Sequence, residues 1–290
     1  GTPLYIYSLG HVLDNYQRLS RAFACTEHLV CFSMKANSNL GLLAALARAG
    51  CGFDIVSGGE LHRVLKAGAD PKKVIFAGVG KTDEEIAFAI RKGILMFNIE
   101  SWPEAEAINR VAGKLKKTGK VDFRINPDVE AGAHKKISTA HKASKFGLPY
   151  HETLSLFKRA KALKHLQVSG IHLHIGSQIT ELKPFVAAAK RALSLVADLR
   201  KAGYPVHTLN MGGGLGIDYQ GEDFKSPEQY AAALKPLFVG SGLKLFFEPG
   251  RYFVGNAGIL VSTVTYVKET RWKDFVIVDA AMNDLIRPSL

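Results

Sequence analysis

Short apolar runs recur eight times along the chain, and longer segments with helical periodicity separate them. β-branched and aromatic residues dominate these runs, which is typical of parallel strands that are buried on both faces. The runs cover residues 30–34, 53–56, 74–77, 95–99, 121–125, 170–175, 208–211 and 243–247. Eightfold alternation of strand and helix predicts an α/β fold, the (β/α)₈ TIM-type barrel, which needs about 250 residues. A doubly wound open sheet is the alternative, but it leaves the strand count unexplained.

Helix signals lie between the apolar runs. Thr82 precedes three acidic residues, and Ser101 precedes the segment Trp102-Pro103-Glu104. Both patterns are typical of a helix start, through a capping side chain in the first case and an early proline in the second. Residues 40–49 and 184–199 are amphipathic and predict two further helices.

The alternation changes near the end of the chain. Residues 259–267 and 275–279 have strand patterns with no helical segment between them. They predict the beginning of an all-β unit. We therefore assign residues 1–252 to the barrel and residues 253–290 to the start of a C-terminal β domain, which we expect to be incomplete.

The composition excludes several classes of protein. Hydrophobic residues make up 47% of the chain, which is enough for a large core. No apolar run could span a bilayer and no secretory signal opens the chain, so we expect no membrane association. We interpret the three cysteines, Cys25, Cys31 and Cys51, as buried free thiols, and this favours a cytoplasmic location.

The chain is basic, with a formal net charge of +12. Such a balance favours an anionic ligand or nucleic acid. The basic residues are spread along the chain, however, and the densest clusters, at 114–117 and 135–145, have no aromatic residues interleaved with them. We therefore expect a small anionic ligand and no nucleic acid.

In a TIM-type barrel the functional groups stand at the C-terminal ends of the strands. Polar residues and glycines occupy these ends here: Lys35, Asp54, Gly78, Asn98, Arg124, His174 to Ser177, Gly212 to Gly214, and Glu248 with Arg251. The loops after strands seven and eight often bind phosphate. In this chain those loops are the glycine run and the turn from Glu248 to Arg251.

The turn Glu248-Pro249-Gly250-Arg251 places an acid and a cation together after an apolar strand. The acid can pair with a cationic ring and the cation with an anion, which suits a pyridinium that carries a phosphate. A carboxylate at a pyridine nitrogen keeps the ring protonated and able to accept electrons, as a decarboxylation requires. A structural salt bridge of Glu248 with Arg251 or Arg124 is the alternative interpretation.

Lys35 closes the first apolar run, and desolvation inside a barrel mouth would favour its neutral, nucleophilic amine. A lysine that merely extends to solvent is the alternative, but a phosphate site at neighbouring strand ends favours a Schiff-base lysine. His172 and His174 would share a face of strand six, with His174 nearer the mouth, where its ring could stack on a planar cofactor. Two histidines without a third ligand are weak evidence for zinc, so we expect no metal.

Five segments together resemble diaminopimelate decarboxylase, a family of fold-type III, alanine-racemase-like barrel enzymes that use pyridoxal 5'-phosphate. The segments are Ser33 to Asn37, Phe53 to Leu61, His174 to Gln178, Met211 to Gly216, and Glu248 to Arg251. Residues 279–288 also resemble this family more than its ornithine and arginine relatives.

The resemblance implies a role for each matching residue. Lys35 would form the Schiff base, His174 would stack on the ring, and Glu248 would hold the pyridine nitrogen, and these are the expected catalytic residues. The expected phosphate ligands are Ser177, Gly213, Gly214 and Arg251; Asp54 and Arg124 would lie near the Schiff base; Arg251 and Arg287 would bind substrate. The implied reaction converts meso-2,6-diaminopimelate to L-lysine and CO₂ in a homodimer with shared active sites.

Three alternatives stay open. The first is a barrel that binds pyridoxal phosphate without catalysis, or a truncated inactive homologue, because the family's Cys-Glu-Ser motif and late tyrosine do not occur in the chain. The second is a decarboxylase of another basic amino acid, of the ornithine or arginine type. The third is a racemase, which Glu248 disfavours because racemases of this fold place a cation at the ring nitrogen.

Overall fold

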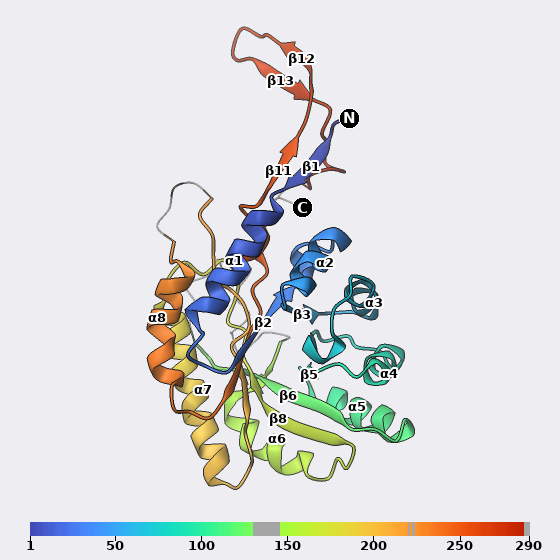
Figure 1. Ribbon diagram of the computed structural model, residues 1–290, viewed down its shortest axis with the longest axis vertical. Helices are drawn as coiled ribbons and strands as arrows, with labels where there is room; N and C mark the ends of the chain where they lie inside the picture. Colours follow the sequence, from blue (N-terminus) through green and yellow to red (C-terminus); the bar gives the residue numbers. More distant parts are fainter. Residues whose placement is uncertain (130–145, 220, 222–223, 287–290) are drawn as a thin grey trace.

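The computed structural model of the protein describes residues 1–129, 146–219, 221 and 224–286. Eight parallel strands form a closed barrel that helices surround (Figure 1). The strands are β2 (His28–Ser33), β3 (Gly52–Ile55), β4 (Val74–Phe76), β5 (Met96–Ile99), β6 (Gly119–Asn126), β8 (Leu166–His172), β9 (Thr208–Asn210) and β10 (Lys244–Phe247). Their order is β5-β4-β3-β2-β10-β9-β8-β6, and the pairing of Phe97 with Val121 closes the ring. The predicted eight-stranded barrel is confirmed; a short strand, β7 (Leu148–Pro149), adds to β6.

The helices begin where the sequence predicts. Thr82 forms a reciprocal capping box with Glu85, and the Ser101 side chain accepts from the Glu104 N–H. The helices are α1 (Leu9–Ala22), α2 (Leu40–Arg48), α3 (Gly58–Lys66), α4 (Asp83–Lys92), α5 (Trp102–Lys114), α6 (Thr153–Ala160), α7 (Lys183–Lys201), α8 (Pro227–Phe238) and α9 (Arg251–Val254), with short 3₁₀ turns η1 (Met34–Ala36), η2 (Pro71–Lys73) and η3 (Tyr150–Glu152).

The inside of the barrel has an apolar layer and a polar layer. Cys31, Ile75, Met96 and Phe246 form a small buried cluster of their own, separate from the larger core that includes residues of the strands and the surrounding helices. Side chains repeat every second residue along a strand. The residues two positions after Cys31, Met96 and Phe246 are Ser33, Asn98 and Glu248, all buried and polar. The strand period therefore puts polar groups above the apolar layer, at the C-terminal end of the barrel.

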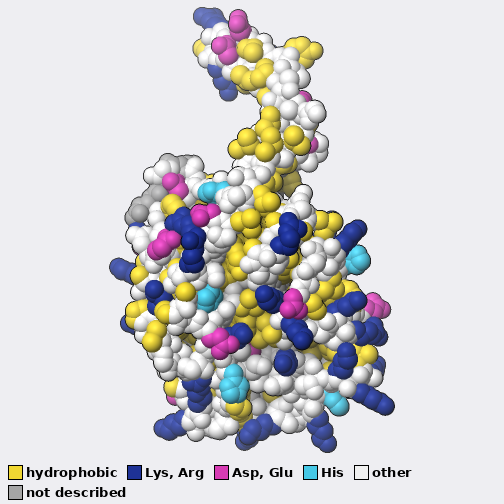
Figure 2. Space-filling model, in the orientation of Figure 1, with side chains coloured by type: hydrophobic (Ala, Val, Ile, Leu, Met, Phe, Trp, Pro, Cys, Tyr) yellow, Lys and Arg dark blue, Asp and Glu magenta, His cyan; other side chains and the backbone are white. Residues whose placement is uncertain are grey.

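Two further two-stranded sheets of the described residues lie apart from the barrel, at the top of Figure 1. β1 (Leu4–Tyr7) pairs antiparallel with β11 (Gly258–Val261), and β12 (Val264–Lys268) pairs with β13 (Phe275–Val278). The prediction of one continuous strand over 259–267 is wrong, because Thr263 leaves β11 and exchanges backbone and side-chain hydrogen bonds with Asp279. Apolar side chains are exposed in this part (Figure 2). Trp272 is 86% exposed. The proposed division at residue 252 stays a prediction. β1 lies before this boundary and pairs with β11, which lies after it.

Three further expectations meet the structure here. Cys31 and Cys51 are buried, but Cys25 is exposed in the turn after α1, so the prediction of three buried thiols is wrong for Cys25. Among the described residues, no helix combines the length and the apolar character that crossing a membrane requires. The basic cluster that begins at Lys135 and Lys136 lies outside the described residues.

The buried Asp122 makes stability depend on pH. Thr208 Oγ1 donates to its two carboxylate oxygens at 2.8 and 3.0 Å. Burial raises the pKa of Asp122 from 3.8 to about 7, although Thr208 and His172 oppose the rise. Between these values the folded protein holds a proton that the unfolded chain has released, so the free energy of unfolding falls as pH rises. Asp122→Asn should remove this decrease in the free energy of unfolding. The stability of the variant relative to the parent should then rise with pH, by at most about 1.4 kcal/mol per pH unit.

Urea unfolding at several pH values checks this prediction, with Asp83→Asn as the control. A hydrogen bond from Arg110 lowers the pKa of the exposed Asp83, so this group titrates below the window in which Asp122 acts. The difference between Asp83→Asn and the parent should stay flat from about pH 5 to about pH 7. A flat difference for Asp122→Asn as well would contradict the raised pKa.

Candidate functional site

A cavity of about 610 Å³ opens at the C-terminal end of the barrel, and residues of β1 and β11 form part of its wall. The predicted site residues that line it are Lys35, His174, Ser177, Gly214, Glu248 and Arg251. Asp54, Arg124 and Gly213 are not among its lining residues. Asp54 lies beside Lys35 and Gly213 donates to His174, so these two residues contact the lining. Arg287 lies outside the described residues. The structure thus brings together six of the predicted residues from four separate segments of the chain.

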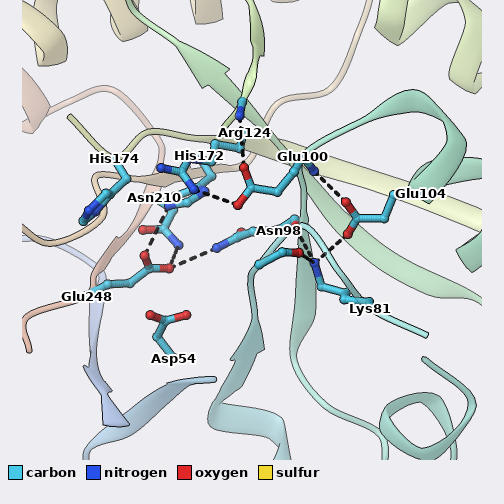
Figure 3. A network of polar contacts seen from close by, with 12 residues as sticks. Asp54, Lys81, Asn98, Glu100, Glu104, Arg124, His172, His174, Asn210 and Glu248 are labelled. Atoms are coloured by element: carbon cyan, nitrogen blue, oxygen red, sulfur yellow. Dashed lines mark hydrogen bonds and ion pairs between the residues drawn. The ribbon is translucent and has the colours of Figure 1, made fainter. Parts of the chain in front are cut away.

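Glu248 is held by three donors from three strands (Figure 3). Asn98 Nδ2 and Asn210 Nδ2 donate to its Oε1 at 3.0 and 2.5 Å, and His172 Nε2 donates to its Oε2 at 3.2 Å. Glu248 is only 4% exposed. Burial by itself would raise the pKa of Glu248, but His172 and Asn210 outweigh burial and lower it to about 2. The carboxylate is therefore ionised at neutral pH.

The contacts of the two arginines decide between the interpretations of Glu248. Arg124 Nη1 donates to Glu100 Oε1 at 2.7 Å, and its guanidinium lies over the Phe146 ring. Arg251 donates to the hydroxyl groups of Tyr219 and Ser177. Within the described part of the chain, no ion pair joins Glu248 to Arg124 or Arg251, so the salt-bridge interpretation is wrong. The acid keeps its charge without a formal cation from an arginine or lysine.

Lys35 lies in the turn η1, immediately after β2 ends at Ser33. Its side chain is 55% exposed, so the expected desolvation of this lysine is wrong. The reason is that β2 ends two residues before Lys35, and the turn η1 places the Lys35 side chain in the open cavity. Lys35 Nζ lies 3.8 Å from Asp54 Oδ2.

Asp54 is buried beside Lys35 and is incompletely paired. Ser33 Oγ donates to its Oδ2 at 2.7 Å, whereas its Oδ1 has no hydrogen-bond partner among the described residues. Burial and the nearby Glu248 raise the pKa of Asp54 to about 7, with Lys35 and Ser33 opposing. Asp54 therefore changes its charge near neutral pH, 3.8 Å from the amine of Lys35.

The two histidines have different partners. β8 ends at His172, which contacts Glu248, so His174 lies in the loop that follows the strand. The Gly213 N–H donates to His174 Nδ1 at 3.2 Å. Burial, together with the charge of Arg124, lowers the pKa of His174 well below its usual range. His174 is therefore neutral and carries its proton on Nε2.

Gly214 of the glycine run and Arg251 also line the cavity. A Cβ on Gly213 would lie 2.2 Å from the Glu248 carbonyl oxygen, and Gly214 has a φ of +111°. Only glycine fits these two positions. Arg251 Nη2 lies 3.5 Å from Ser177 Oγ, and its buried Nε has no hydrogen-bond partner among the described residues. A donor of this kind next to side-chain-free backbone suits an oxygen-rich anion.

These features fit pyridoxal phosphate. Glu248 lines the cavity as a carboxylate that no arginine or lysine of the described residues neutralises, as a protonated ring nitrogen requires. The unpaired Nε of Arg251 and the glycine run suit a phosphate. Lys35 also lines the cavity, and its exposed Nζ is the amine that could bind an aldehyde.

Sequence reasoning missed the donors that hold Glu248. Asn98 was placed at a strand end without a role, Asn210 was only part of a strand, and His172 had no assigned partner. A usable signal exists, because each is a polar residue at an inward position of a buried apolar strand. Tyr219, which accepts from Arg251 Nη1, gave no such signal because it follows a loop glycine run.

Comparisons with known proteins show the family of the chain. The family described as "Pyridoxal-dependent decarboxylase, pyridoxal binding domain" matches residues 9–255. The chain is 50% identical to diaminopimelate decarboxylase of Pseudomonas aeruginosa, with 100% of this chain and 70% of the relative covered. It is 49% identical to the enzyme of that name from Neisseria meningitidis, with 100% and 71% covered.

Solved structures give the same result. The crystal structure of diaminopimelate decarboxylase from Helicobacter pylori complexed with L-lysine superposes with a TM-score of 0.96 at 38% identity, covering 100% of this chain and 73% of that one. A lysine/ornithine decarboxylase from Vibrio vulnificus, 20% identical with a TM-score of 0.83 over 97% of this chain and 72% of that one, shares the fold. The chain belongs to the diaminopimelate decarboxylase family of pyridoxal phosphate-dependent barrel enzymes.

Proposed function

We propose that the protein removes CO₂ from meso-2,6-diaminopimelate to give L-lysine, with pyridoxal phosphate as cofactor. The observation that carries this function is the buried, ionised Glu248 carboxylate in a cavity that Lys35 also lines. Relatives at about half identity are diaminopimelate decarboxylases, and the similar structure from Helicobacter pylori is a complex with L-lysine. A decarboxylase of another basic amino acid is the second candidate, because a lysine decarboxylase from Selenomonas ruminantium shares the fold at 26% identity.

The site residues have separate roles in holding the cofactor. Lys35 would bind its aldehyde carbon, Glu248 its ring nitrogen and His174 a face of its ring. Ser177, Gly213, Gly214 and Arg251 would hold its phosphate. When bound, pyridoxal phosphate accepts the electron pair that remains on the substrate when CO₂ leaves. In the absence of cofactor the Gly213 N–H donates to His174, so this glycine would also fix the tautomer of the histidine.

Glu248 would hold a proton on the ring nitrogen, and its three donors prepare the carboxylate for this role. They keep the carboxylate ionised and fix its orientation before the reaction begins, so no reorganisation is needed when charge develops. Because two of the donors are neutral amides, the negative charge stays available to the ring. Such supporting hydrogen bonds commonly tune the group that they orient.

Asp54 would hold or release a proton at Lys35 Nζ. It lies 3.8 Å from that amine, and its pKa of about 7 lets it do either near neutral pH. Arg124 would act on the site through its charge, which disfavours the imidazolium form of His174. For the substrate, Arg251 and Arg287 remain the proposed carboxylate ligands.

A homodimer with shared active sites and a cytoplasmic location complete the proposal. The exposed apolar side chains of β12 and β13 support an assembly that covers them, since apolar patches of this kind are often interaction surfaces.

Lys35→Ala should abolish the near-visible absorbance band of protein-bound pyridoxal phosphate, because no other amine of the described cavity lining can replace Lys35. Absorbance titration with the cofactor measures this loss. Lys244→Ala, which removes a surface lysine paired with Glu27, is the matched control and should keep the band. A band that survives in Lys35→Ala would exclude Lys35 as the binding amine.

Glu248→Gln should still bind the cofactor but lower kcat by roughly 100-fold or more, which is the usual loss when one electrostatic stabiliser is removed. Steady-state CO₂ release and the cofactor absorbance together separate the two effects. Glu228→Gln removes an exposed acid paired with Arg18 and should leave kcat unchanged. An unchanged kcat in Glu248→Gln would mean that the carboxylate is only structural.

A substrate comparison decides between the two candidate functions. CO₂ release should be fastest on meso-diaminopimelate and much slower on ornithine and arginine. Release from ornithine alone would replace the proposed substrate but keep the reaction type. No release from any of them, with cofactor bound, would favour a non-catalytic barrel.

A further inference from the structure

Lys81 is a buried cation that the proposed mechanism does not use. It lies in the loop between β4 and α4, and its side chain is 0% exposed. Lys81 Nζ donates to the Gly78 carbonyl at 2.7 Å, to the Asn98 carbonyl at 2.9 Å and to Glu104 Oε1 at 2.5 Å. An ammonium group has three N–H donors, so all of them are used. The three acceptors come from the ends of β4 and β5 and from the first turn of α5.

The burial of the ion pair between Lys81 and Glu104 needs a physical reason. Desolvation of an ammonium and a carboxylate is costly, and the attraction between them repays it only when the geometry is good and the other donors are satisfied. Burial raises the pKa of Glu104, with Lys81 opposing the rise. An apolar pair of similar volume would often give equal stability. The hydrogen bonds that Lys81 directs to backbone carbonyls are what an apolar pair could not supply.

Those hydrogen bonds converge on residues 98–100. Lys81 holds the carbonyl of Asn98, and Glu104 Oε2 accepts from the N–H of Glu100 at 2.9 Å. The side chains of Asn98 and Glu100 contact residues of the site instead. Asn98 Nδ2 donates to Glu248, and Glu100 holds Arg124 through Oε1 and the Gly147 N–H through Oε2. Figure 3 shows the chain of contacts from Lys81 to Glu248.

We propose that Lys81 is a positioning residue for the cofactor site: it fixes the end of β5 so that Asn98 meets Glu248 and Glu100 meets Arg124. It touches neither the cavity nor Glu248 itself. The segment that it fixes supplies one of the three donors that keep Glu248 ionised and oriented. This inference rests on the proposed function, because its catalytic consequence acts through Glu248.

Lys81→Met keeps the length of the side chain and removes all three donors. We expect kcat on meso-diaminopimelate to fall by about 10- to 100-fold, since small displacements of positioned groups cost rates of this size. KM should change less than about threefold, since the variant alters how Glu248 is held and leaves the substrate ligands in place. Hydrogen exchange in the cofactor-free protein gives a second readout, in which the amides of residues 98–104 should lose protection.

A double variant separates positioning from stability. Lys81→Met alone leaves Glu104 buried without its cation and lowers stability. Lys81→Met/Glu104→Leu replaces the pair by apolar residues and should regain much of the urea midpoint. It restores no hydrogen bond to Asn98 or Glu100, so kcat should stay at least about tenfold below the parent. Where Lys81→Met does not fold, the double variant carries the same comparison.

Arg110→Met is the matched control. Arg110 on α5 pairs with Asp83, the first residue of α4, so it also ties α5 to the segment around the start of α4, but it is exposed and has no described contact with residues 98–100. Its kcat and its exchange at residues 98–104 should equal those of the parent. Loss of kcat in Arg110→Met equal to that in Lys81→Met would overturn the proposal, because the effect would then be general to helix packing.

Two other results would also overturn it. One is a kcat within threefold of the parent in either folded Lys81 variant. The other is recovery of kcat together with stability in the double variant, which would make Lys81 merely structural. Failure of the proposed function would look different: the parent itself would release no CO₂ from meso-diaminopimelate or would lack the cofactor band. The exchange measurement needs neither activity nor cofactor.

Discussion

The site depends on one buried carboxylate that has no arginine or lysine against it. Glu248 would be too costly to ionise in the barrel unless several donors compensated its charge. Asn98, Asn210 and His172 supply them from β5, β9 and β8. A salt bridge would have stabilised the acid equally well but would have consumed its charge. Compensation by mostly neutral donors keeps the anion stable and still able to attract a cationic ring.

The same requirement explains why the barrel must close. Three donors from three strands can meet one carboxylate only if the strands curve around it and keep their register. The apolar layer of Cys31, Ile75, Met96 and Phe246 fixes that register one step below the site. A slip of one residue along any strand would turn its polar side chain outward. Closure of the ring between β5 and β6 is thus a condition for the electrostatics.

The two buried acids of the site show how donors decide a pKa. Asp54 and Glu248 are equally inaccessible, yet the pKa of Asp54 is raised to about 7 and that of Glu248 is lowered to about 2. Glu248 accepts three hydrogen bonds, whereas Asp54 accepts one from Ser33 and has an ammonium only at 3.8 Å. Opposite shifts in neighbouring acids are the usual sign that one holds charge and the other moves a proton.

Local patterns in the sequence predicted most of the fold and the principal site residues. Strand period, capping residues and the rule that function lies at strand ends are local, and they located Lys35, His174 and Glu248 correctly at the mouth. Contacts between distant segments were not predictable. Lys81 looks like a solvent-exposed lysine before a helix cap, and only folding buries it against Asn98 and Glu104. The periodicity of side chains along the sequence also cannot predict the pairing of β1 with β11, which lie more than 250 positions apart.

Two parts of the chain line the cavity, and they contribute different kinds of side chain. The barrel supplies the charged and hydrogen-bonding groups, whereas Tyr5, Tyr7 and Leu260 of β1 and β11 line the facing wall. That wall is apolar and aromatic, so it offers shape and excludes water but has little to add to the chemistry itself. Exclusion of water strengthens every electrostatic contact inside a site. The strength of an electrostatic contact between Glu248 and a ring nitrogen therefore depends on β1 and β11, which lie outside the barrel.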